Sequence, residues 1–325
     1  MEVAEQYLKL TPAAEHQADV ALALSGIYSK RQQFDKANEL LLPFLNDPDE
    51  TKRRNAFFQT AYNLQLSGKA DDALASYEKF IADGKNDRLT YLAFKNSAMI
   101  YLQKKDEDKA ADVMSKAVQS FADNDFSLKT YLWLVEYWQT KGDAQKMLDT
   151  LVIAGKIHEK DPGAVAIKFF AGQAYRMQDN CKQAIEYYDL VTAGDQASIY
   201  KGRSRLGKGV CLTGLGDYKG AKKELEQAVV DSPDDAFVAM RARFALAHNA
   251  EFLKEFDMAA KLYLVVDVLY NDPEYAPKSL LRAASLLEEQ LNNKKEAVNA
   301  YNKIVKVYPN SAEAARAQEK ITQLK

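Results

Sequence analysis

Small and apolar residues recur along the chain at helical spacing, separated by short polar segments. In one recurring motif a small residue, nearly always Ala, is followed four and seven residues later by apolar side chains, as at Ala73, Tyr77 and Phe80. This spacing places the three residues on one face of a helix. We call the first residue of each motif the anchor, and the anchors are Ala37, Ala73, Ala110, Met147, Ala184, Ala221, Ala259 and Ala297. Their regular separation of 36 to 38 residues predicts an array of structural repeats.

A further helix is predicted before each anchor. Apolar and small residues form another stripe about nine to thirteen residues upstream, for example Ser97 and Ala98 with Tyr101. Short breaker segments separate the two stripes, such as Lys141-Gly142-Asp143, where a glycine can close a helix in the left-handed conformation. Proline follows several second stripes, as at Asp161-Pro162, and cannot continue the helix before it. Each repeat is therefore predicted to be a pair of helices.

The repeats resemble tetratricopeptide repeats, whose pattern runs from a large residue through Leu-Gly, Tyr, Ala, an aromatic residue and Ala to Pro. The segment 206–233 is a good copy, and the residues at the family's positions are Gly209, Ala221, Leu225, Ala228 and Pro233. The units depart from the family by running a few residues longer than the usual length of about 34. Met147 also replaces the small anchor in the fourth unit. The resemblance implies an all-α, right-handed superhelical solenoid of about eight antiparallel helix pairs.

The resemblance covers nearly the whole chain, so we expect a single solenoid over residues 1–325. Its eight repeats are placed at residues 18–310. Residues 311–325 are expected to form one further helix, N-capped by Ser311, that covers the end of the array. Residues 1–12 are interpreted as the second helix of a unit whose first helix is missing, and Met1 is therefore not expected to be the natural start.

The charge balance bears on the class of partner. Lys and Arg number 44 against 46 Asp and Glu, which gives a net charge of -2. This balance supplies no broad positive field to hold nucleic acid or anionic lipid. No apolar run approaches the ~18 to 20 residues that a membrane span requires. We therefore expect a protein or peptide partner, with no nucleic acid and no direct membrane span.

Two features of the sequence resemble catalytic or metal-binding motifs but lack the residues that such sites need. Residues 202–209 reproduce the glycine and lysine spacing of a phosphate-binding loop, but Gly209 stands where that loop needs a hydroxyl for magnesium, and the segment lies in a predicted helix with no strand before it. His16, His158 and His248 fall in different repeats, without further ligands at metal-binding spacing. We therefore predict no enzyme activity, no catalytic residue, no metal site and no cofactor.

The two cysteines lie in neighbouring repeats. Cys181 falls in the turn of the fifth pair, and Cys211 lies late in the first helix of the sixth, near the same edge. A disulfide needs Cα atoms within ~7 Å, which this placement allows. Two separate reduced thiols are nevertheless the default expectation, with the disulfide as the alternative.

In the tetratricopeptide family the first helices of successive pairs line a concave groove. The resemblance places a partner-binding surface on those helices, and its candidate residues are Asn55, Phe58, Tyr62, Lys95, Lys129, Gln173, Arg176, Arg203, Arg241, Phe244, His248 and Arg282. From the third unit onward this row is mostly basic, which favours an acidic or carboxylate-bearing peptide. The alternative is that these charges only solubilise the helices. Lys95 has no companion Asn in register, so the row does not match the clamp by which some family members hold chaperone tails.

Three functions are compatible with this pattern. The segment Tyr308-Pro309-Asn310-Ser311, followed by an Ala-rich helix, resembles repeats of periplasmic and outer-membrane assembly proteins. A non-catalytic scaffold for assembling a bacterial envelope complex, placed in the periplasm or cell envelope, is therefore the first hypothesis. The alternatives are a cytosolic adaptor or regulator, and the repeat region of a larger enzyme.

Overall fold

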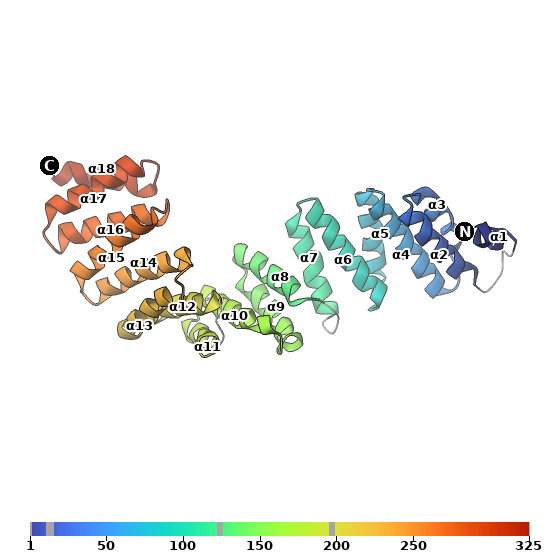
Figure 1. The fold of residues 1–325 in the computed structure, drawn as a ribbon, viewed down its shortest axis with the longest axis horizontal. Coiled ribbons are helices and arrows are strands. Elements are labelled where there is room, and N and C mark those ends of the chain that lie inside the picture. The colour runs from blue at the N-terminus through green and yellow to red at the C-terminus, as the bar shows by residue number, and fades with distance from the viewer. Residues whose placement is uncertain (1, 11–15, 122–125, 195–198, 325) are drawn as a thin grey trace. The chain divides into compact units, whose positions relative to one another are not determined.

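Regular structure in this protein is entirely helical wherever the structure describes it. The computed structural model describes residues 2–10, 16–121, 126–194 and 199–324. Over these ranges eighteen α-helices and two short 3-10 helices follow one another, and the same ranges contain no strand (Figure 1). The predicted all-α repeat fold is confirmed.

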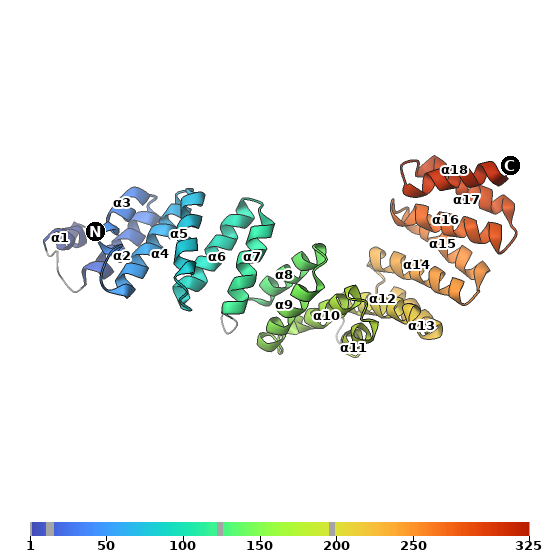
Figure 2. The same ribbon diagram turned by 180° about the vertical axis from the view of Figure 1, so that it is seen from behind.

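The helices form eight consecutive pairs. The first helices of the pairs are α2 (Gln17–Lys30), α4 (Glu50–Leu66), α6 (Arg88–Gln103), α8 (Leu128–Thr140), α10 (Val165–Met177), α12 (Ile199–Gly214), α14 (Ala236–Phe252) and α16 (Tyr275–Glu289). The second helices are α3 (Phe34–Glu39), α5 (Ala70–Ala82), α7 (Glu107–Ser120), α9 (Ala144–Ile157), α11 (Cys181–Thr192), α13 (Tyr218–Val230), α15 (Phe256–Tyr270) and α17 (Lys294–Val307). Figure 2 shows the same succession from behind.

Four shorter or terminal elements complete the chain. The 3-10 helix η1 (Leu42–Phe44) follows α3, and η2 (Pro162–Ala164) leads into α10. Helix α1 (Glu2–Leu10) precedes the first pair. Helix α18 (Ala312–Leu324) follows the last pair and packs against α17 and α16, as predicted for a terminal helix that covers the array.

Each pair turns through one residue in the left-handed conformation, always five positions before the anchor. These residues have φ between 49° and 83°, and they are Gln32, Gly68, Lys105, Gly142, Asp179, Gly216, Lys254 and Asn292. Only three are glycines, although a side chain makes this conformation unfavourable. The next residue often caps the second helix: the side chains of Asp106, Asp143, Asn180, Asp217 and Asn293 each accept a backbone N–H three residues further on. The turn therefore depends on capping as well as on glycine.

Buried tyrosines join the two helices within several pairs. Tyr77, Tyr188, Tyr263 and Tyr301, each four residues after an anchor, are completely buried. Met147, at the anchor of the fourth pair, is also completely buried. Burial of such large side chains contributes on the order of 1.5–3 kcal/mol each. The spacing of anchor and tyrosine thus corresponds to the core-facing side of each second helix.

Contacts divide the chain into two compact units, residues 1–130 and 131–325. In unit 1 the guanidinium of Arg54 on α4 donates to the carboxylates of Asp83 and Asp87 and, at 3.0 Å, to the hydroxyl of Thr90 on α6. In unit 2 the cores of α14 to α18 merge around Tyr263, Tyr301 and their Ala neighbours. A single solenoid over residues 1–325 stays a prediction.

Candidate functional site

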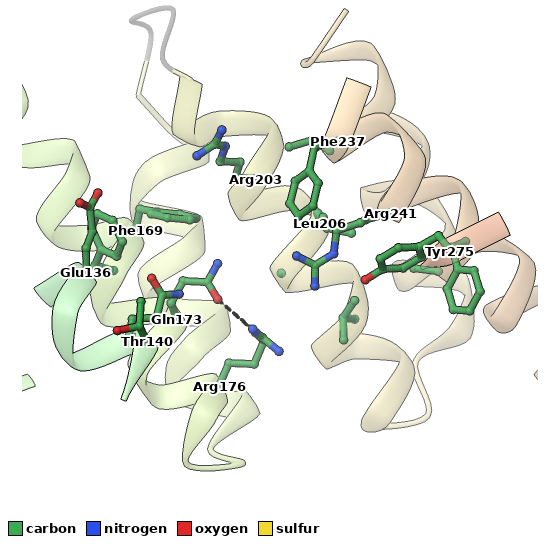
Figure 3. A pocket seen from close by; sticks show the side chains of 17 residues that line it. Glu136, Thr140, Phe169, Gln173, Arg176, Arg203, Leu206, Phe237, Arg241 and Tyr275 are labelled. Atoms are coloured by element: carbon green, nitrogen blue, oxygen red, sulfur yellow. Dashed lines mark hydrogen bonds between the residues drawn. The ribbon is translucent and has the colours of Figure 1, made fainter. Parts of the chain in front are cut away.

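A pocket of about 530 Å³ opens within unit 2, on the first helices of successive pairs (Figure 3). It draws side chains from α8, α10, α12 and α14 and from the start of α16, and those labelled in Figure 3 are Glu136, Thr140, Phe169, Gln173, Arg176, Arg203, Leu206, Phe237, Arg241 and Tyr275. This volume lies in the range of typical ligand pockets. The first helices of several pairs therefore contribute to one recess.

Close packing beneath the pocket depends on two glycines. A Cβ atom added at Gly172 on α10 would lie 2.6 Å from the ring of Tyr188, and one added at Gly207 on α12 would lie 2.5 Å from it. Because neither residue has a side chain, the ring of Tyr188 on α11 fits between α10 and α12. Gly207 itself lines the pocket, so this packing sets the position of the pocket wall.

Arg176 occupies a position that takes a different residue in other pairs. This position lies eight residues before the anchor, and in the second and seventh pairs it holds Gln65 and Glu251. Gln65 accepts a hydrogen bond from the Tyr77 hydroxyl at 2.9 Å, and Glu251 accepts one from the Tyr263 hydroxyl at 2.7 Å. The corresponding residue in the fifth pair is Arg176, beside the hydroxyl of Tyr188. Burial raises the pKa of Tyr188 above its ordinary value, and the Arg176 charge opposes the rise. The guanidinium itself donates to Oε1 of Gln173 at 3.0 Å.

Arg241 on α14 is held by aromatic rings. Its guanidinium carbon lies 5.0 Å from the ring centre of Phe237 and 6.0 Å from that of Tyr275. Such stacking positions a cation without neutralising its charge. Figure 3 shows Arg176 and Arg241 approaching the space between α10 and α14 from opposite sides. Within the described residues neither guanidinium forms a salt bridge, so both keep N–H donors for a carboxylate.

Two acidic side chains offset part of this charge, and one of them, Glu136, lines the pocket. Arg203 on α12 donates to Oδ2 of Asp235 at 3.0 Å, so its charge is largely matched. Glu136 on α8 lines the opposite end and is exposed. The pocket lining holds three arginines against Glu136, and its positive character is therefore concentrated at Arg176 and Arg241.

Five of the twelve predicted groove residues line this pocket, namely Gln173, Arg176, Arg203, Arg241 and Phe244. Phe244 packs edge-on against Tyr263 and Tyr275, each at 5.3 Å between ring centres. Two more predicted residues lie in unit 2 outside its lining: exposed His248 contacts the ring of Phe252, and exposed Arg282 pairs with Glu251.

The other five predicted residues belong to unit 1. Asn55 lines a small recess of about 140 Å³, and Phe58 packs on Tyr77 and Phe80. Tyr62, Lys95 and Lys129 are exposed. The pocket lining thus contains the predicted residues of the fifth to seventh pairs except His248, and the other predicted residues do not line it.

Sequence reasoning missed several pocket residues. Glu136 follows Val135, which stands twelve residues before Met147, where other repeats have a small residue such as Gly172. The same register could have identified Glu136 as a groove residue. Phe237 and Tyr275 lie at the starts of α14 and α16, outside the stripe that the prediction followed.

The enzyme-like motif has a structural explanation. Residues 202–209 lie inside α12, where Gly202, Gly207 and Gly209 are buried. Lys208 forms salt bridges with Asp189 at 2.6 Å and Glu224 at 2.9 Å. The described residues include no group of three or more His, Cys, Asp and Glu side chains that could hold a metal ion. They also include no helix that is both long and apolar enough to cross a membrane.

Similarity to known proteins agrees with the repeat register. Models of the tetratricopeptide repeat family match residues 59–125 and 278–311. No curated protein matches the chain in sequence. Among solved structures, the type IV pilus biogenesis factor PilW is similar over 71% of this chain and 100% of its own, with a TM-score of 0.55 and 17% identity.

Two further structures give the same fold. PilF of Pseudomonas aeruginosa is similar over 71% of this chain and 97% of its own, with a TM-score of 0.50 and 16% identity. A structure of Naa15/Naa10 bound to HypK is similar over 94% of this chain, with a TM-score of 0.58 and 16% identity, and this chain spans 45% of it. The two family-model matches thus identify tetratricopeptide repeats at residues 59–125 and 278–311, and the solved structures share the all-α repeat fold of the eight helix pairs.

Proposed function

We propose that this protein is a non-catalytic scaffold and that its pocket on α10, α12 and α14 binds an acidic peptide segment of a partner protein. Tetratricopeptide repeats generally serve protein–protein interaction, which supports the scaffold role. The observation that carries the finer proposal is the pair Arg176 and Arg241, which face one recess without a carboxylate partner among the described residues.

The apolar lining suggests what accompanies the acidic group. Phe169, Leu206 and Phe244 lie beside the arginines, and exposed Val210 adds further apolar surface. A peptide that combines Asp or Glu with a neighbouring apolar side chain would fill the recess and pair with a guanidinium. The proposed ligand is therefore a short mixed segment, rather than a run of acidic residues alone.

We further propose that the partner belongs to a bacterial envelope assembly, in the periplasm or cell envelope. The Tyr-Pro-Asn-Ser segment at 308–311 motivates this step. PilW, a relative in fold, is described as a pilus biogenesis factor, which is compatible with it. A cytosolic adaptor, or the repeat region of a larger enzyme, would use the same groove, so the peptide experiment addresses the site independently of the compartment.

A selection from a random peptide library on the immobilised chain tests the site. We expect the selected peptides to contain Asp or Glu beside an aromatic or aliphatic residue. Synthetic versions with Asn or Gln in place of the acids should bind at least about tenfold more weakly, since a charge-assisted pair contributes about 1.5–3 kcal/mol.

The test variant carries both Arg176→Glu and Arg241→Glu. Its matched control is Arg316→Glu on α18, and both variants are compared with wild type. Arg316 is exposed and lies outside the pocket lining. The double variant should lose binding of the acidic peptides, whereas Arg316→Glu should keep it. Equal binding by all three proteins would refute the proposed site.

A further inference from the structure

The two cysteines of this protein lie at one helix interface. Cys181 is the first residue of α11 and is half-buried, whereas Cys211 lies near the end of α12 and is completely buried. Helices α11 and α12 are consecutive and pack against each other. The start of α11 and the end of α12 therefore meet at the same end of this helix pair.

The helical register directs both side chains into that interface. Tyr188 on α11 contacts Gly207 on α12. Cys181 lies seven residues before Tyr188 on α11, which is about two helical turns, so it shares the face of Tyr188. Cys211 lies four residues after Gly207 on α12, which is about one turn, so it shares the face of Gly207. Both cysteines are displaced from the Tyr188–Gly207 contact in the same direction along the interface. Cys181 is also among the groups that raise the pKa of the Cys211 thiol, which agrees with this placement, and the two cysteines are not disulfide-bonded in the structure.

The two thiols differ in reactivity. Burial raises the pKa of the Cys211 thiol far above its ordinary value, and the neighbouring Cys181 adds to the rise while Arg176 opposes it. Cys211 is therefore a protonated thiol without access to solvent. Cys181 is only half-buried and is the first residue of α11, so it is the thiol that an oxidant in solution can reach.

We propose that Cys181 and Cys211 form a disulfide that links α11 to α12 directly behind the pocket wall. In the first step the Cys181 thiolate attacks a small-molecule disulfide such as oxidised glutathione, and one glutathione thiolate leaves. In the second step Cys211 loses its proton and attacks the Cys181 sulfur, which releases the second glutathione. Overall, two protein thiols are oxidised to one disulfide, and one glutathione disulfide is reduced to two glutathione thiols.

This cross-link joins positions that the folded chain already holds together. It closes a segment of about 30 residues, for which chain entropy predicts a sizeable stabilisation of the folded state. Because Cys211 must lose a proton in a buried position, the second step is expected to be slow. The disulfide should accumulate in an oxidising compartment and be absent where glutathione keeps thiols reduced.

Incubation of the purified full chain with oxidised glutathione, followed by intact mass and non-reducing peptide mapping, tests the proposal. We expect an intact mass lower by two hydrogens, a cross-linked peptide containing both cysteines, and no bound glutathione. The melting temperature of the oxidised protein should exceed that of the reduced protein by about 5–10 °C, and reductant should reverse the shift.

Two variants serve as controls. Cys181→Ser should show neither the mass loss nor the rise in melting temperature. Cys211→Ala should retain glutathione on Cys181, since the second step is blocked, and circular dichroism shows whether this core variant folds. If Cys211→Ala does not fold, the comparison of wild type with Cys181→Ser alone serves as the control. Wild-type protein that retains glutathione on Cys181 with a free Cys211, or that forms only disulfide-linked dimers, would overturn the proposal.

Discussion

Arginines on first helices serve different purposes in the two units. In unit 1, Arg54 is 8% exposed and its guanidinium is engaged by Asp83, Asp87 and Thr90. In unit 2, Arg176 and Arg241 face a recess and contact an amide or aromatic rings instead of carboxylates. Arg54 thus holds helices together in unit 1, whereas Arg176 and Arg241 of unit 2 remain available to a ligand, unlike Arg203 and Arg282, which pair with carboxylates.

The first-helix surfaces differ in polarity as well. In unit 1 the neighbouring helices α4 and α6 expose the apolar side chains of Tyr62, Leu66, Met99 and Leu102, each 37–45% exposed, and Tyr62 and Met99 occupy equivalent repeat positions. In unit 2 the corresponding positions include Gln173 and Arg176 beside aromatic residues. The larger recess, with arginines that have no carboxylate partner among the described residues, therefore lies in unit 2, and the peptide site is proposed there.

The anchors should be equally important in both units. Ala221 and Ala73 are completely buried, so an Asp at either position places a carboxylate in the core without a partner. We expect Ala221→Asp and Ala73→Asp each to lower the free energy of unfolding by about 3 kcal/mol or more. Urea denaturation provides the measurement, and Ala75→Asp, on the exposed side of α5, is the matched control. If an anchor variant were as stable as this control, the repeat register would be wrong.

Replacing Arg54 should affect stability in a pH-dependent way. Burial opposes ionisation of Asp87, but hydrogen bonds from Thr90 and the charge of Arg54 together hold its pKa below the ordinary value. A carboxyl whose pKa is lowered in the folded state stabilises the fold above its unfolded pKa of about 3.9, and that contribution is lost as pH falls through the folded pKa.

We therefore expect Arg54→Met to lower the free energy of unfolding by about 1–2 kcal/mol at pH 7, because Asp83 and Asp87 are themselves partly exposed. The difference from wild type should shrink below about pH 4. Arg241→Met in unit 2 is the comparison, since no carboxylate pairs with Arg241 in the described structure. A similar pH-dependent loss in both variants would remove the distinction between the units.

Two glycines of α12 should respond oppositely to the same substitution. Gly207→Ala places a methyl group against the ring of Tyr188, so it should destabilise the fold by about 1 kcal/mol or more despite the better helix propensity of Ala. Gly214 has no atom within 4 Å of an added Cβ, so Gly214→Ala should stabilise by up to about 1 kcal/mol. Thermal melts of both variants measure the effects, and a stabilised Gly207→Ala protein would contradict the packing described beneath the pocket.

The repeat register could be predicted because each repeat buries the same positions. Anchor, tyrosine and turn recur at fixed spacing, so Ala184, Tyr188 and Asp179 could be located from their counterparts in other units. The left-handed turn at Lys105 was not evident from its residue type, since glycine is the usual signal. Its position relative to Ala110 is what identifies it.

The candidate site was less predictable, because side-chain pairing depends on contacts far apart in sequence. Arg203 and Arg241 occupy equivalent positions, yet Arg203 pairs with Asp235 whereas Arg241 stacks on Phe237. Nothing in the repeat pattern distinguishes them. Similarly, Glu136 was hidden because Val135 and Met147 replace the small residues that mark the register elsewhere.

The smallest expected effect concerns Lys95, the exposed lysine of α6 in unit 1. If the acidic peptide binds between Arg176 and Arg241, Lys95→Glu should change its affinity by less than about twofold, because Lys95 does not line the pocket and exposed charges outside a site are largely screened at physiological salt. Arg241→Glu alone should cost about tenfold, since it removes a charge-assisted partner. Fluorescence anisotropy with one labelled peptide compares the two variants. A loss at Lys95 as large as that at Arg241 would mean that the ligand also engages unit 1, so the binding surface would extend beyond the pocket of unit 2.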